Sequence, residues 1–193
     1  MVTTIMPSFM DSIGQMRPES AIIGRLLAGY GELEVSMMFC VAILPGNDLD
    51  TATKSTFSVR GEKDRIDRAA ALLKPDYSAA GFGAELTDTI SDMHWCREIR
   101  NQFSHCQWIS WHRHLGLKFV NLEDVAAMSG TIRKLATASH DVSLSILQDQ
   151  EAYFNYVMAC FSALAQAFKC KVAAKPNRGL PRPAKMARPQ KHS

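Results

Sequence analysis

The chain of 193 residues lacks any hydrophobic run near the ~20 residues that a helix needs to cross a bilayer. Its longest run, Val35 to Leu44, ends at Pro45 and Gly46. The first ten residues contain no basic residue ahead of an apolar stretch, so we expect no secretory signal there. The five cysteines are odd in number and scattered, so no disulfide framework is indicated. These features favour a cytoplasmic protein in a reducing environment, with no membrane partner.

Several signatures of catalysis are also missing from the sequence. It contains no Walker-type phosphate loop, no Gly-x-Ser-x-Gly nucleophile turn and no zinc-protease helix. The nearest approach to a metal-binding set combines His94, Cys96, Cys106, His112 and His114, but the spacing matches no standard zinc site. We therefore expect neither a metal ion nor a cofactor.

Acidic residues are absent from the last 25 residues, Lys169 to Ser193, which hold eight Lys or Arg and four of the eight prolines. The overall charge of +3 therefore hides a net charge of −5 on the rest of the chain. We predict that residues 171–193 form a disordered basic tail, because such a segment buries too little apolar surface to order itself. Two interpretations of the tail remain open, contact with nucleic acid phosphates or a purely solubilising role.

Apolar residues spaced three and four apart predict two long helices, from about Glu19 to Leu44 and from about Asp141 to Lys169. Gln150 is the one polar interruption in the second of them. A shorter helix is predicted from about Glu62 to Leu73, ending before Pro75. A fourth is predicted over residues 84–108, after a glycine-rich loop.

The remaining segments complete a predicted all-α fold. Residues 48–57 favour a turn or two of helix, residues 108–122 a small hairpin and residues 122–128 a short helix. We expect an up-and-down bundle of four to five helices with a small β-hairpin insertion. The predicted organisation is an N-terminal extension over residues 1–17, a helical domain over 18–170 and the basic, proline-rich tail over 171–193.

The helix expected over residues 84–108 has two distinct sides when residues are placed about 100° apart. The apolar side, expected to face the core, consists of Cys96, Ile99, Phe103 and Cys106. The polar side consists of His94, Glu98, Asn101 and His105, bordered by Arg97 and Arg100. Solvated helix faces usually carry Lys and Glu, so a polar side with two histidines, an amide and two arginines is unusual in content.

These residue types suit the cleavage of RNA without a metal ion. RNA supplies its own nucleophile, the 2′-hydroxyl, and histidine titrates in the right range to move a proton. Arginine stays charged and binds phosphate oxygens through two N–H groups. We take Arg100, Asn101 and His105 as candidate catalytic residues. A plain alternative is a surface helix whose charged residues form local ion pairs.

His94, Arg97 and Glu98 share the polar side and are candidate supporting residues. Arg100 lies about 7.5 Å along the helix axis from His105, so one helix alone does not complete the site. Two copies of the chain meeting face to face would double these groups and form a cleft between subunits.

The segment from Arg100 to His105 resembles the motif of the HEPN family, the "higher eukaryotes and prokaryotes nucleotide-binding" domains. That motif is an arginine, four to six residues, then a histidine, often with a polar residue directly after the arginine. The resemblance covers roughly residues 18 to 170 and implies a compact bundle of four or five helices. Many members are metal-independent endoribonucleases that dimerise around one cleft, and several act as toxins or in phage defence beside an antitoxin protein.

By this resemblance, His105 is the catalytic base or acid, Arg100 binds the phosphate and Asn101 supports them. The implied partners are RNA, a second copy of the chain and an antitoxin protein. Some relatives are catalytically silent, including regulators similar to the mannitol operon repressor. The alternative function is therefore a silent helical regulator or partner-binding module. For Trp108 and Trp111 we expect a core or interface position rather than stacking on bases.

Overall fold

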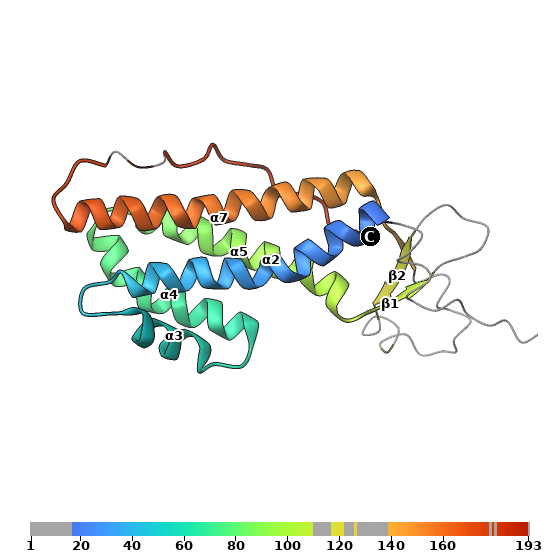
Figure 1. Cartoon of the computed structure of the whole chain (residues 1–193), viewed down its shortest axis with the longest axis horizontal. Helices are drawn as coiled ribbons and strands as arrows, with labels where there is room; N and C mark the ends of the chain where they lie inside the picture. The colour runs from blue at the N-terminus through green and yellow to red at the C-terminus, as the bar shows by residue number, and fades with distance from the viewer. Residues whose placement is uncertain are drawn as a thin grey trace, which may run out of the picture. The chain divides into compact units, whose positions relative to one another are not determined.

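The computed structural model describes residues 17–109, 117–121, 126, 139–177, 179 and 181–192. Within these ranges the chain is mostly helical and carries one small three-stranded sheet, which confirms the expected helical bundle with a small β element (Figure 1). The helices are α2 (Arg17–Ala42), α3 (Leu49–Phe57), α4 (Glu62–Ala79), α5 (Gly83–Ser104) and α7 (Leu144–Val172).

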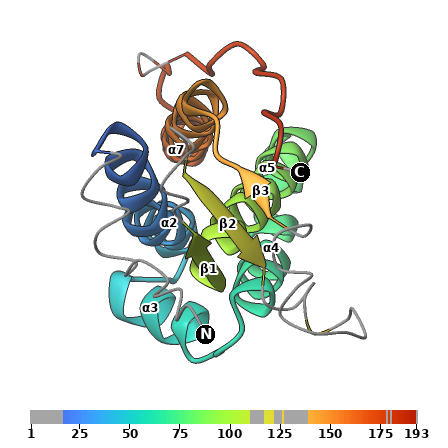
Figure 2. The same ribbon diagram turned by 90° about the vertical axis from the view of Figure 1, so that its right-hand side faces the viewer.

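The sheet consists of β1 (Cys106–Ile109), β2 (Lys118–Asn121) and β3 (His140–Asp141), in the order β1-β2-β3 (Figure 2). Both pairings are antiparallel, and Phe119 lies opposite Trp108 on one side and His140 on the other. The predicted hairpin is confirmed by β1 and β2, whereas the third strand was not expected. The connection over residues 110–116 lies outside the described residues, as does most of the helix expected over 122–128.

Contacts between α-carbons divide the chain into two compact units. Unit 1 comprises the residues up to Leu27, then Ile99–Glu151 and Pro189–Ser193. Unit 2 comprises Ala28–Glu98 and Ala152–Arg188. The candidate catalytic residues Arg100, Asn101 and His105 therefore all belong to unit 1.

The apolar spacing that predicted α2 and α7 marks the buried faces of both helices. In unit 2 this buried set includes Leu33, Met37, Cys40, Val157, Phe161 and Phe168, none more than 1% exposed. The Cys40 thiol lies 3.7 Å from the carbonyl oxygen of Phe161 and donates to it. Each of these helices contributes one face to the core, as the periodicity indicated.

Helix α4 runs six residues beyond its predicted end and contains Pro75. Proline lacks the N–H that would bond to the carbonyl four residues earlier, so an end before it was the reasonable expectation. The turn that follows carries Tyr77, which is fully buried and stacks on Phe168 with ring centroids 4.4 Å apart. Tertiary packing therefore outweighs the local cost, and the connection to α5 turns at Gly81, whose φ is +90°.

The helical turns expected over residues 48–57 are present as α3. The Asp48 carboxylate caps this helix by accepting from the Thr51 N–H at 2.7 Å. The same hydrogen bond lowers the pKa of Asp48.

The segment expected to be a disordered tail differs from that expectation. Its first two residues extend α7. Most of the rest returns as extended chain, and residues 181–192 of it are called the strap below (Figure 1). In unit 2, Arg188 donates to Asp92 at 3.0 Å and to Ser91 at 2.7 Å, and lies 5.4 Å from the ring centroid of Trp95. Arg182 and Lys185 lie 3.8 and 3.9 Å from Asp88. The basic residues of this segment, from which disorder was predicted, therefore pair with acidic residues on α5.

The end of the strap docks onto unit 1 through its backbone. Gln102 on α5 donates to the carbonyl of His192 at 2.8 Å and accepts from its N–H at 3.2 Å. Gln150 on α7 donates to the carbonyl of Gln190 at 2.8 Å. The His192 ring, 4% exposed, lies edge-on to Phe103 and Phe119. This contact explains why a polar residue, Gln150, interrupts the apolar face of α7: its buried amide donates a hydrogen bond to the strap.

Candidate functional site

His105 lies just outside the motif helix instead of within it. Helix α5 ends at Ser104, His105 forms a bend and Cys106 begins β1, whereas the sequence predicted a helix to Trp108. The reason is the pairing of Cys106–Ile109 with Lys118–Asn121, which takes up backbone hydrogen bonds that a longer helix would have kept. The angular argument that placed His105 on the polar face of the helix therefore does not apply to it.

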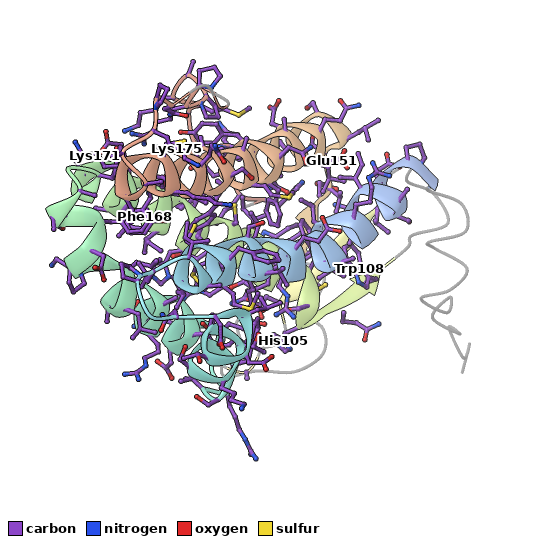
Figure 3. The ribbon with its side chains drawn as sticks, turned by 60° about the vertical axis from the view of Figure 1, so that its left-hand side comes forward. His105, Trp108, Glu151, Phe168, Lys171 and Lys175 are labelled. Carbon is purple, nitrogen blue, oxygen red and sulfur yellow. The ribbon has the colours of Figure 1, made fainter. Side chains whose placement is uncertain are left out.

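The bend leaves the imidazole of His105 accessible to solvent. Figure 3 labels His105 at the start of this segment and Trp108 farther along it. A histidine on an exposed bend can approach a ligand from solvent, which a histidine packed in the core cannot do. This accessibility is the first requirement for proton transfer to or from an RNA strand.

Arg100 and Asn101 lie near the end of α5, and both residues are half-buried. A guanidinium nitrogen of Arg100 donates to the side-chain oxygen of Asn101 at 3.2 Å. This contact orients a permanently charged group close to the bend that carries His105. Arg100 and Asn101 are therefore joined by a hydrogen bond, and His105 follows them on the bend.

The three candidate supporting residues lie in unit 2, where they have local partners. His94 lies 3.1 Å from Asp67 on α4, and Lys63 lies 2.6 Å from the same carboxylate. Arg97 lies 3.9 Å from Glu98. Burial, assisted by the charge of Arg97, lowers the pKa of His94 despite the nearby Asp67. The structure thus gives His94, Arg97 and Glu98 contacts within unit 2.

Cys106, directly after His105, is unsuited to act as a nucleophile. Burial raises the pKa of its thiol to about 12, so the reactive thiolate is scarce at neutral pH. The thiol donates to the carbonyl of Phe103 at 3.4 Å. Its role is local packing at the start of β1, although the sequence placed it on the buried face of a helix.

No three His, Cys, Asp or Glu side chains of the described residues are grouped so that they could hold a metal ion. His112 and His114, weighed as ligands from the sequence, lie outside the described residues. Of the metal candidates that are described, Cys96 is buried, and His94 is hydrogen-bonded to Asp67.

Trp108 occupies the core position expected for it. It is 8% exposed, and its ring lies 6.0 Å from that of Phe103 and 5.8 Å from that of Phe119. These contacts connect the end of α5 to β1 and β2 within unit 1. The position of His105 is thus set by an aromatic cluster on both sides of it in the chain.

A pocket of about 500 Å³ opens in unit 1 beside this segment. One wall comes from α2 and consists of Ser20, Ile23, Gly24 and Leu27. The other wall consists of Phe103, Ser104, Cys106, Gln107, Trp108 and Leu117. Two of these residues flank His105 in the chain. No local sequence pattern indicates this pocket, because its two walls are about 80 residues apart and only the fold joins them.

Over the described part of the chain, no helix combines the length and the apolar character needed to span a membrane. Comparison with protein-family models, with curated proteins and with solved structures finds no match. The resemblance of Arg100, Asn101 and His105 to the HEPN motif is therefore an expectation from the sequence.

Proposed function

We propose that the protein is a HEPN-like, metal-independent endoribonuclease that cleaves RNA by attack of the 2′-hydroxyl on the adjacent phosphate. The observation that carries this proposal is the exposed His105 on the bend that directly follows the helical turn bearing Arg100 and Asn101. A proton-transfer group and a permanent cation within six residues supply the two functions that the reaction needs.

The reaction requires two proton transfers and stabilisation of charge. The 2′-oxygen forms a bond to phosphorus and loses its proton, while the bond from phosphorus to the 5′-oxygen breaks and that oxygen gains a proton. His105 takes or gives one of these protons, and Arg100 stabilises the negative charge on the phosphorane oxygens. Asn101 holds the guanidinium of Arg100 in place through the 3.2 Å contact. The products are a 2′,3′-cyclic phosphate and a 5′-hydroxyl.

One imidazole cannot be both base and acid in the same step. We therefore propose a homodimer in which the two copies of His105 face one cleft, so that one accepts a proton while the other donates. An RNA-degrading dimer in the cytoplasm needs restraint, which is consistent with a toxin or phage-defence role and an antitoxin partner.

The test is incubation of the pure full-length chain with mixed RNA in excess chelator. We expect fragments ending in a cyclic phosphate, and we expect His105→Ala to abolish them. His140→Gln is a matched control, because His140 lies on β3 of the same unit and is outside the proposed site. Intact RNA with the wild-type chain, or cleavage that survives His105→Ala, would refute the proposal.

The second candidate function is a catalytically silent regulator or partner-binding module. It is favoured by Val35 and Phe39, which lie one turn apart on α2 and are 40% and 49% exposed. An exposed apolar pair of this kind suits a contact with another protein. If this second function is the right one, RNA stays intact in the cleavage assay. Phe39→Lys should then weaken the contact and lower the mass of the assembled protein measured by light scattering. An unchanged mass would count against it.

A further inference from the structure

We propose that the unit 1 pocket between α2 and the end of α5 is a nucleobase-binding site, which seats one base of the RNA while Arg100 and His105 engage the neighbouring phosphate. The assignment of the phosphate to these two residues rests on the proposed function. The binding of a base in the pocket is argued from the pocket itself and can be tested separately.

The α5 residues that line the pocket follow Arg100 closely in the chain. Phe103 and Ser104, which line it, are three and four residues after Arg100, and such residues stack on one helix face. One helical turn separates them along the axis, about 5–6 Å. His105 lies between the lining residues Ser104 and Cys106, with neighbouring α-carbons about 3.8 Å apart. When a phosphate contacts Arg100 and His105, the base of the same nucleotide can therefore reach the pocket.

The lining has the chemistry that a nucleobase requires. Apolar and aromatic side chains, among them Ile23, Leu27 and Trp108, can cover the faces of a flat heterocycle. The exposed Gln107 carries an amide that both donates and accepts, as the edge of a base does. The volume of about 500 Å³ falls within the range of about 300–1,000 Å³ found for small-ligand sites.

Gly24 lines the pocket on the α2 side. Glycine inside a helix costs about 1 kcal/mol relative to alanine. A β-carbon placed on Gly24 would meet nothing within 4 Å, so the fold of the chain does not require glycine there. Because Gly24 lines the pocket, a long side chain at this position would extend into the space that the base occupies. Gly31 on the same helix is equally open but does not line the pocket.

These two glycines give a matched pair of variants, Gly24→Leu and Gly31→Leu. The measurement is the affinity of the full chain for each of the four nucleoside 3′-monophosphates by isothermal titration calorimetry. We expect the wild type and Gly31→Leu to bind at least one of them equally well. We expect Gly24→Leu to bind it at least tenfold more weakly, with an unchanged or higher melting temperature, because leucine is the better helix former.

A second variant tests the pocket without filling it. Gln107→Ala removes the amide at the edge of the pocket and is expected to change the order of preference among the four bases. His105→Ala is expected to abolish cleavage, whereas Gly24→Leu acts on the seat of the base. The wild-type chain could bind a nucleotide, lose that binding in Gly24→Leu, and yet cleave no RNA. This outcome would support the nucleobase site and refute the proposed nuclease activity. Equal affinity of wild type and Gly24→Leu, or no binding of any of the four nucleotides, would overturn the pocket even if RNA is cleaved.

Discussion

The guanidinium of Arg100 is the group in the proposed site whose contribution can be measured most cleanly, because it stays charged at every accessible pH. We predict that Arg100→Gln lowers kcat for RNA cleavage about 100- to 1,000-fold, the usual cost of losing one group that stabilises transition-state charge. Arg100→Lys keeps the charge but loses the planar fork and the geometry of the 3.2 Å contact to Asn101, so it should fall in between. Single-turnover kinetics measure both variants, and wild-type rates in Arg100→Gln would remove this residue from the mechanism.

A second prediction at this scale concerns the ion pair of Arg65 with Glu34 in unit 2. Arg65 donates to Glu34 at 2.7 Å, the two side chains are only 17% and 10% exposed, and the hydrogen bond raises the pKa of Arg65. Arg65→Met strands the Glu34 carboxylate in a largely buried position, so we expect a loss of about 3 kcal/mol in the free energy of unfolding. Urea denaturation measures this loss.

The control for that prediction is the double variant Glu34→Leu with Arg65→Met. Because it removes both charges, it should recover most of the lost stability. If the double variant is as unstable as the single one, packing of the arginine stem rather than a stranded charge causes the loss.

Residue-scale reasoning predicted the buried apolar faces well, since hydrophobic periodicity depends only on neighbours in the chain. It did not predict which polar residues are buried. Glu34 and Gln150 are both buried, and each meets a partner from a distant segment: Glu34 accepts from Arg65, and the Gln150 amide donates to the strap. No local pattern in the sequence reports such a pairing.

At the scale of elements, we expect the docking of the C-terminal strap to depend on pH through His192. Its Nε2 accepts from the Ser143 N–H at 3.2 Å, and burial, aided by the nearby His140, lowers the pKa of His192 below 6.5. The folded chain therefore binds fewer protons than the unfolded chain in the window below pH 6.5. The contribution of the neutral His192 to the free energy of unfolding is therefore fully present above this window. It is lost as the pH decreases through the window.

Urea denaturation at a series of pH values measures this dependence. The series runs from about pH 7.5 to about pH 5, which brackets the ordinary histidine pKa of about 6.5. His192→Gln should show a shallower loss of stability on acidification than the wild type. A residual slope is expected from His94, whose pKa burial also lowers. Identical slopes in wild type and His192→Gln would contradict the docking of this ring.

The elements also show where sequence patterns stop being informative. Helices α2, α5 and α7 were predicted because each has a long periodic face. The end of α5 was misplaced by four residues, because β-pairing with Lys118–Asn121 takes over after His105. The strap was expected to be disordered from its composition alone, and its order comes from carboxylates and amides on α5 and α7. Both differences arise from tertiary contacts that override local preference.

At the scale of the whole molecule, a cleft that needs two imidazoles makes activity depend on both subunits. Mixing wild-type chains with an excess of His105→Ala chains, under conditions that allow exchange, should lower the activity per wild-type chain by the fraction of mixed dimers. His140→Gln chains mixed in the same way should have no effect. Activity that stays proportional to the amount of wild-type chain in both mixtures would show that one copy suffices.

The proposed cleavage is best tested by the chemistry of the RNA ends that the pure chain produces in excess chelator. We expect 2′,3′-cyclic phosphate and 5′-hydroxyl ends with the wild type, and neither with His105→Ala. Uncut RNA, ends carrying a 5′-phosphate, or cyclic phosphate ends that persist in His105→Ala would contradict it.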